Sequence, residues 1–144
     1  MTVSVQEMND RYSVFNGGDP AAIVAQFAPD AVYRQMESGQ VAIGPEQIGQ
    51  VMAGWKHFFG GAQIEDIEVA PADFLVADGP DGATQCFTVD FVGCGTYDNT
   101  IPGLEEVAPA KGQDVRLPIG ETVWLNEAGQ FIRVDNTIQV SALN

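Results

Sequence analysis

Apolar residues at helical spacing open the chain. Four of them lie three or four residues apart: Val5, Met8, Tyr12 and Phe15. Gly17-Gly18 follows as a stop signal, so this spacing predicts a first helix. Asp19-Pro20 then begins a second, short helix, because Asp caps free N–H groups and Pro fits the first helical position. Pro29 ends that second helix.

A third helix is predicted from Gly44-Pro45-Glu46 to Gly60-Gly61. Its broad apolar stripe consists of Ile48, Val51, Met52, Trp55, Phe58 and Phe59. The remaining segments are typical of strands. These segments are 31–36, 63–69, 73–77, 84–96, 115–125 and 131–140. Pro71, the turn 78–82, a polar loop 98–113 and the turn 126–129 separate the later ones.

The order of these elements predicts an α+β fold, because helices come early and strands cluster late instead of alternating. A curved antiparallel sheet that closes over the helices covers one face of each strand. The space between this sheet and the helix 44–59 is then the natural place for a pocket.

Composition narrows the classes of partner. The 144 residues fit one domain, 1–144, and 20 acidic against 6 basic residues give a net charge of -14. Such a surface repels phosphate backbones and anionic lipid, so we expect neither nucleic acid nor membrane partners. No apolar run is long enough to span a membrane, and the N-terminus lacks the basic, apolar start of a secretion signal. The expected location is the cytoplasm.

The sequence offers little for metal binding or disulfide formation. Cys86 and Cys94 fall in one predicted strand, where eight extended residues span roughly 26 Å, beyond the reach of a disulfide. We expect free thiols. His57 is the single histidine, so no zinc site is predicted, and we expect no metal.

Several runs carry a family resemblance. They are Phe15-Asn16-Gly17-Gly18-Asp19-Pro20, Phe27-Ala28-Pro29-Asp30-Ala31-Val32, Gly44-Pro45-Glu46, Pro109-Ala110-Lys111-Gly112 and Asn126-Glu127-Ala128-Gly129-Gln130-Phe131. Together they resemble the SnoaL-like domain of the nuclear transport factor 2-like superfamily, which includes polyketide cyclases, ketosteroid isomerases and limonene-epoxide hydrolases. The resemblance implies a cone-shaped, cystatin-like sheet wrapped around three helices, a homodimer, no cofactor, and a pocket for a small, largely apolar molecule.

The isomerase and cyclase sites of that superfamily match this chain incompletely. The isomerase base position holds Gln35, which cannot take a proton, and the helix tyrosine position falls at Arg11, with Tyr12 next to it. The position of the protonated carboxylic acid holds Glu121. The two positions that the cyclases use for His and Asp hold Gly95 and Gln139.

The epoxide hydrolase pattern is half present. Tyr33 matches, Gln35 keeps an amide, and Asp90 matches the first Asp of the triad. Thr88 stands where an Arg is expected, and Asn136 stands at the second Asp, next to Asp135. The losses remove the charge that neutralises the carboxylates and the acid that protonates the leaving oxygen.

The candidate catalytic residues are therefore Asp90, Glu121 and Tyr33. The candidate ligand-binding residues are Gln35, Trp55, Phe59, Leu117, Ile119 and Asn136. The alternation Phe87-Thr88-Val89-Asp90-Phe91 permits two arrangements: aromatic residues in the core with Asp90 outside, or the reverse, with Asp90 in the pocket. Glu121 is likewise either a surface residue or a polar group in an apolar pocket.

Two functional hypotheses follow. One is a polyketide cyclase-like or epoxide hydrolase-like enzyme that performs cofactor-free acid/base chemistry on a carbonyl or cyclic ether. The other is a non-catalytic ligand-binding or dimerisation module with the same fold. An open cavity with converging ionisable groups favours the enzyme, whereas a cavity filled by Trp55, Phe58 or Phe59 favours the module.

Overall fold

The computed structural model describes residues 2–97 and 112–139. Three α-helices are present: α1 (Val5–Ser13), α2 (Pro20–Val24) and α3 (Gly44–Phe58). A 3-10 turn, η1 (Val14–Gly17), extends α1. The start of α1 is capped by Ser4, whose Oγ accepts the Glu7 N–H at 3.1 Å, and that of α2 by Asp19, which accepts the Ala21 N–H at 3.0 Å. The three predicted helices are confirmed, but two of them end earlier than predicted, because Phe27 and Pro29 belong to a strand and Phe59 begins another.

Six strands form one sheet in the order β2-β1-β6-β5-β4-β3. They are β1 (Phe27–Gln35), β2 (Gln40–Ile43), β3 (Phe59–Pro71), β4 (Gln85–Tyr97), β5 (Asp114–Leu125) and β6 (Phe131–Ile138). All neighbours pair antiparallel except β1 and β6, which run parallel. The prediction of a curved sheet in an α+β fold is confirmed, and its wholly antiparallel pairing is wrong at this one pair.

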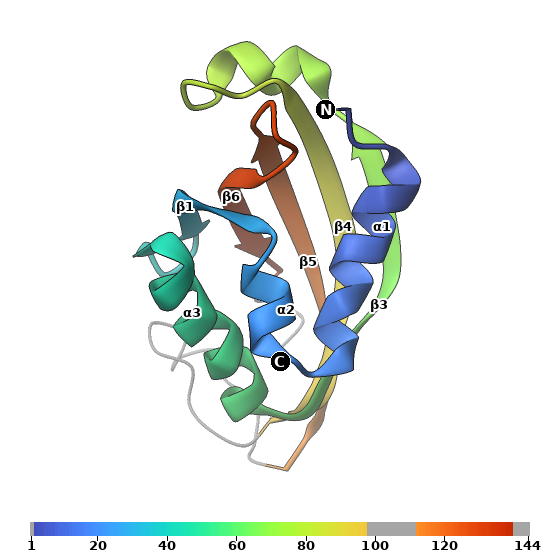
Figure 1. The fold of residues 1–144 in the computed structure, drawn as a ribbon. Helices are drawn as coiled ribbons and strands as arrows, with labels where there is room; N and C mark the ends of the chain where they lie inside the picture. The colour runs from blue at the N-terminus through green and yellow to red at the C-terminus, as the bar shows by residue number, and fades with distance from the viewer. Residues whose placement is uncertain (1, 98–111, 140–144) are drawn as a thin grey trace.

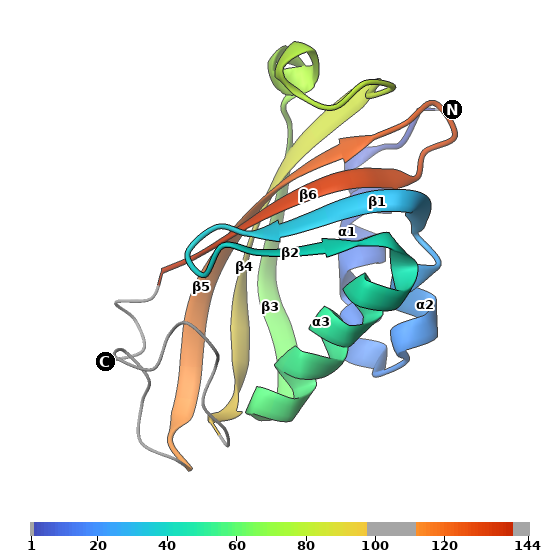
Figure 2. The same ribbon diagram turned by 90° about the vertical axis from the view of Figure 1, so that its left-hand side faces the viewer.

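The sheet curves around the three helices, which lie together on its concave face (Figures 1 and 2). The main core fills the space between the two layers. Met8 of α1 and Ile48 of α3 are completely buried there against inward-facing strand residues such as Val89, Val123 and Val134. Alternation along each strand sends every second side chain into this core.

Two segments differ from the sequence-based expectation. Residues 73–77, predicted as a strand, belong to a 3-10 helix, η2 (Asp73–Asp78), and β2 was not predicted. Five residues are too few to separate a strand period from a helical one, and a four-residue strand carries almost no period at all. Most of the predicted polar loop, 98–111, and with it Pro109-Ala110-Lys111, lies outside the described residues.

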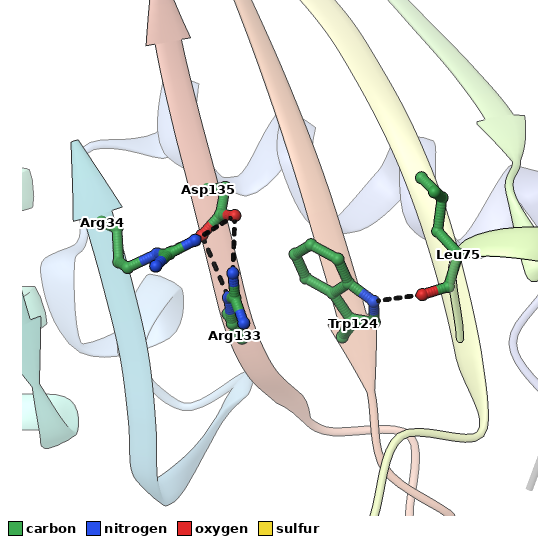
Figure 3. Close-up of polar contacts among 5 residues, drawn as sticks. All are labelled: Arg34, Leu75, Trp124, Arg133 and Asp135. Carbon is green, nitrogen blue, oxygen red and sulfur yellow. Dashed lines mark hydrogen bonds and ion pairs between the residues drawn. The ribbon is translucent and has the colours of Figure 1, made fainter. Parts of the chain in front are cut away.

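On the convex face, η2 covers one end of the sheet. Trp124 of β5 is buried beneath it and donates its indole N–H to the carbonyl of Leu75 at 3.0 Å. Beside it Arg34 of β1 and Arg133 of β6 both bind Asp135 (Figure 3). Cys86 lies under η2, and it and Cys94 are free thiols, as predicted. Within the described residues, no helix is long and apolar enough to cross a membrane.

Candidate active site

A cavity of about 110 Å³ lies between α1, α3 and the concave face of the sheet. Its walls are largely apolar and unusually aromatic. The aromatic lining residues are Tyr12, Phe15, Phe27, Tyr33, Trp55, Phe59, Phe91 and Phe131. The rings of Trp55 and Phe59 stack with their centroids 5.9 Å apart, and both line the cavity.

Three polar residues from three strands lie side by side in this cavity region because of the register of the sheet. Gln35 of β1 pairs with Asn136 of β6, and Asn136 pairs with Glu121 of β5. Residues paired in register point to the same face, so all three side chains are inward. The same row continues into β4 and β3 with Val89 and Val69, which are apolar. The polar group is thus confined to one end of the row.

Glu121 is the centre of the polar group. The Tyr12 hydroxyl donates to its Oε1 at 2.6 Å, and the Tyr33 hydroxyl donates to its Oε2 at 3.1 Å. The Asn136 side-chain amide donates to Oε2 at 2.7 Å. These donors come from α1, β1 and β6, so the carboxyl group on β5 joins the helical layer to the two strands on one side of β5.

The environment raises the pKa of Glu121 above its ordinary value of 4.5. Burial is the main cause, because it disfavours the charged carboxylate. The hydrogen bonds from Tyr12, Asn136 and Tyr33 act in the opposite direction but do not outweigh it. Glu121 retains some accessible surface and lines the cavity. The carboxyl group is therefore able to hold or release a proton nearer to neutral pH than a surface glutamate.

Both tyrosines remain protonated donors at physiological pH. The pKa values of Tyr12 and Tyr33 are raised well above 10.0, first by burial and then by the negative charge of Glu121. Their hydroxyl groups can therefore turn between Glu121 and a bound molecule without becoming phenolates.

A chain of amides fixes the orientation of Asn136. The Ser38 N–H donates to Gln35 Oε1 at 2.7 Å, which turns the Gln35 amino group toward Asn136 Oδ1 at 3.2 Å and Glu37 Oε1 at 2.8 Å. With its oxygen held by Gln35, Asn136 can only present its amino group to Glu121. A backbone N–H of the β1–β2 turn thus decides the direction of a hydrogen bond inside the cavity.

The predicted site residues divide into three groups. Those lining the cavity are Tyr33, Trp55, Phe59, Leu117, Ile119, Glu121 and Asn136. Gln35 is buried behind Asn136 and acts through it. Asp90 lies on the opposite face, exposed, next to Gly120 of β5, because Phe87, Val89 and Phe91 take the inward positions of β4. The structure therefore places Asp90 outside the pocket.

Sequence reasoning missed Tyr12 as a site residue. The alignment put the helix tyrosine at Arg11, and an error of one residue turns a side chain by about 100° around a helix. The signal was nevertheless available, because the spacing of Val5, Met8, Tyr12 and Phe15 already places Tyr12 on the apolar face of α1. Arg11 also lines the cavity, with its Nη1 donating to the carbonyl of Gly129 and its guanidinium above the ring of Phe131.

No metal centre emerges from residues 2–97 and 112–139, which contain no group of three or more His, Cys, Asp or Glu side chains able to hold an ion. Among the described lining residues of the cavity, Glu121 alone carries a carboxyl group, and one carboxyl group offers too few oxygen ligands for a hard cation.

Comparison with known proteins assigns the family. The sequence model of the SnoaL-like domain matches residues 5–134. The chain belongs to the SnoaL-like domain family. The resemblance predicted from the sequence is thereby confirmed. No curated protein matches this SnoaL-like chain at a significant level.

Solved structures support the same fold. A proposed polyketide cyclase of Xanthomonas campestris pv. campestris is 25% identical, with a TM-score of 0.71, and the match covers 95% of this chain and 93% of that one. A second proposed polyketide cyclase, of Pseudomonas putida KT2440, is 23% identical, with a TM-score of 0.69 and coverage of 94% and 91%. The epoxide hydrolase/cyclase-like enzyme SalBIII of salinomycin pyran ring formation is 15% identical, with a TM-score of 0.67 and coverage of 94% and 89%.

The SnoaL-like chain departs from the cyclase pattern at Gly95 for a visible steric reason. A Cβ atom at Gly95 would meet the Phe59 Cβ at 2.9 Å and the Gly60 carbonyl oxygen at 3.1 Å. The side chain of Phe59 occupies the space that a histidine at position 95 would need. The local packing around Gly95 thus leaves no room for that side chain.

Proposed function

We propose that this SnoaL-like protein binds a small, largely apolar molecule in its cavity and exchanges a proton with it through Glu121. The reaction is cofactor-free acid/base chemistry of the cyclase, isomerase or epoxide hydrolase type. The observation that carries the proposal is the position of Glu121, a carboxyl group of raised pKa at the polar end of an otherwise apolar, aromatic cavity. Three ionisable side chains, Glu121, Tyr12 and Tyr33, converge at that end.

A cyclic ether is one substrate that fits this chemistry. Protonated Glu121 gives its proton to the ring oxygen while a C–O bond breaks and its electron pair goes to that oxygen. A hydroxyl group of the ligand, or a water molecule, then adds to the carbon and loses its proton to the Glu121 carboxylate. Oε1 is the better placed oxygen for the proton, because it accepts one hydrogen bond while Oε2 accepts two. A group with a pKa near the working pH serves such a cycle best.

The test is turnover against a panel of small epoxides, cyclic ethers and polyketide-like aromatic ketones, followed by substitution of the carboxyl group. For any compound that turns over, Glu121→Gln is expected to lower kcat by at least about 100-fold, since it removes the proton donor and keeps the shape. Asp90→Asn removes a carboxylate from the convex face and is expected to leave kcat unchanged. Full turnover by Glu121→Gln would contradict the proposal.

A non-catalytic binding module is the second candidate, and one observation favours it. Both oxygens of Glu121 already accept internal hydrogen bonds, and the lining residues that the structure describes include no second carboxyl group to share the roles of acid and base. The two candidates differ in the panel above, because a module binds compounds without turning any over. The homodimer and the cytoplasmic location expected from the sequence stay predictions.

A further inference from the structure

The carboxylate of Glu121 can accept one more hydrogen bond in the cavity. A carboxylate offers about four lone-pair positions, and three of those on Glu121 are taken by Tyr12, Tyr33 and Asn136. One position remains. It can be filled only by a group that brings its own hydrogen, such as an N–H or O–H of a bound molecule.

A second acceptor in the same cavity is also unsatisfied. Gln26 lines the cavity, and its amino group donates to the Arg11 carbonyl at 3.1 Å. Its Oε1 is buried and has no hydrogen-bond partner among the described residues. A buried acceptor without a partner costs about 1–3 kcal/mol, so a ligand that donates near it gains an advantage over one that only accepts.

The walls favour positive charge. Eight aromatic side chains line the cavity, and the faces of aromatic rings attract cations. In the described part of the chain, no basic side chain forms an ion pair with Glu121. The net charge of -14 adds to this preference at long range, because it draws cations toward the molecule and repels anions.

We infer that the cavity binds a small apolar ammonium ion, a protonated tertiary amine whose single N–H donates to Glu121 while its carbon skeleton contacts the aromatic walls. A tertiary ammonium has one N–H for the one open position on the carboxylate. The cavity of about 110 Å³ is smaller than the dry cavity of about 150 Å³ that accepts benzene, so the ligand is no larger than about a single ring. The inference rests on the proposed ligand cavity and assigns the chemical class of what fills it.

The opposing arrangement would use Arg11, the one basic side chain among the described lining residues, to hold an anion. Its guanidinium is already engaged, however, by the Gly129 carbonyl and by the face of Phe131. An anion at the polar end would also lie against Glu121 and be repelled whenever that group is ionised. We therefore expect the cavity to discriminate against anions of the same size and shape.

The experiment compares three ligands with one six-membered ring each and different charge: N-methylpiperidinium, cyclohexanol and cyclohexanecarboxylate. Binding is measured by calorimetry and by chemical-shift changes of the Trp55 indole. The amine is expected to bind at least about tenfold more tightly than the alcohol at neutral pH, and the carboxylate not at all. Its affinity is expected to rise with pH through the pKa of Glu121, because the cation binds the ionised form.

Matched variants separate the effect of the carboxyl group in the cavity from the effect of the protein's overall charge. Glu121→Gln is expected to remove the preference for the amine and leave alcohol binding in place, whereas Asp90→Asn, with the same change of charge on the convex face, is expected to change neither. The pH dependence of the unsubstituted protein keeps the test decisive if Glu121→Gln folds poorly.

Three outcomes would contradict the inference in different ways. Equal affinity for amine and alcohol removes the ammonium preference and leaves the ligand cavity of the proposed function standing. Tighter binding of the carboxylate assigns the polar end to Arg11. Failure of all three ligands, and of the epoxide and ketone panel above, removes the proposed function together with the inference.

Discussion

Two carboxyl groups on opposite faces of the same sheet have opposite kinds of hydrogen-bond partner, charged for one and neutral for the other. Asp135 on the convex face receives two hydrogen bonds from Arg34, at 2.8 and 2.7 Å, and two from Arg133, at 3.2 and 3.0 Å. Glu121 on the concave face receives three hydrogen bonds, all from neutral groups. The two positions are close in the sheet, because Asn136, which donates to Glu121, directly follows Asp135 in β6.

The difference lies in what offsets the cost of burial. Burial alone would raise the pKa of Asp135, but the hydrogen bonds and charges of Arg34 and Arg133 outweigh it and hold the pKa below 3.8. Around Glu121 burial wins over neutral donors, and the pKa rises. Charged partners thus make a permanently ionised structural link on one face, whereas neutral partners leave a titratable group on the other. The comparison can be tested by removing each element in turn.

The largest effect on stability is expected from Asp135→Asn. The substitution leaves Arg34 and Arg133 close together without their shared partner, and the Asp135 side chain is only 16% exposed. The loss in unfolding free energy should be roughly 2 kcal/mol, between the values typical of exposed and of fully buried pairs. Urea unfolding measures it. A loss within the error of the measurement would mean that the ion pairs of Asp135 with Arg34 and Arg133 contribute nothing measurable to the free energy of unfolding.

The pH dependence of stability is expected to have opposite signs at the two carboxyl groups. The contribution of Glu121 is fully present at low pH and is lost as the pH rises above about 4.5, because its folded pKa is raised. The contribution of Asp135 is present above about 3.8 and is lost as the pH falls, because its folded pKa is lowered. Each unit of difference corresponds to about 1.4 kcal/mol.

Urea unfolding of the protein, Glu121→Gln and Asp135→Asn over a range of pH separates these contributions. The stability of the unsubstituted protein minus that of Glu121→Gln should fall with rising pH, and the same difference for Asp135→Asn should rise. Two difference curves with the same slope would refute the contrast between neutral and charged partners.

A smaller effect is expected from Gln35→Leu, which acts on Glu121 from outside the cavity. Without the Gln35 amino group, Asn136 is free to turn its oxygen toward Glu121, and the pKa of Glu121 should rise further. Carboxyl carbon NMR of Glu121 follows the titration, and the stability cost should be about 1 kcal/mol because the Ser38 N–H loses its acceptor. Gln40→Leu, at an exposed position of β2, is the control and should leave the titration unchanged.

The smallest effect is expected from Asp90→Asn. Asp90 is exposed on the convex face, and in the described residues it makes no ion pair. Its substitution should change the unfolding free energy by less than about 0.5 kcal/mol and leave turnover and ligand binding unaltered. A large loss of turnover would restore Asp90 as a catalytic candidate and would place the reaction on the other face of β4.

Elements with a regular hydrophobic period or a local capping signal were predictable from the sequence, whereas features fixed by long-range strand pairing were not. The stripe from Ile48 to Phe58 and the cap at Asp19-Pro20 predicted α3 and α2, because helix periodicity and capping are local properties. The parallel pairing of β1 with β6 cannot be read from either strand alone, since it depends on which edges meet after folding. The segment 73–77 has four apolar residues in sequence, which fit a strand or a 3-10 turn equally well.

The site was predictable where alternation decided the face. Tyr33 and Gln35 share a face by alternation, as do Leu117, Ile119 and Glu121, and the structure places all five side chains inward. Asp90 was settled only by the three-dimensional burial of its aromatic neighbours. The amide chain from Ser38 to Asn136 could not be foreseen, because it depends on the register between β1 and β6, whose residues lie about 100 positions apart.

The same parallel pair has a consequence for how the protein is made. During synthesis β1 leaves the ribosome long before β6, yet β6 lies between β1 and β5 in the finished sheet. Until residues 131–138 emerge, Glu121 lacks Asn136, and β1 has no neighbour on that edge. A nascent chain halted before this point has a helical layer and part of a sheet but no assembled cavity, so the cavity forms only after β6 has been synthesised.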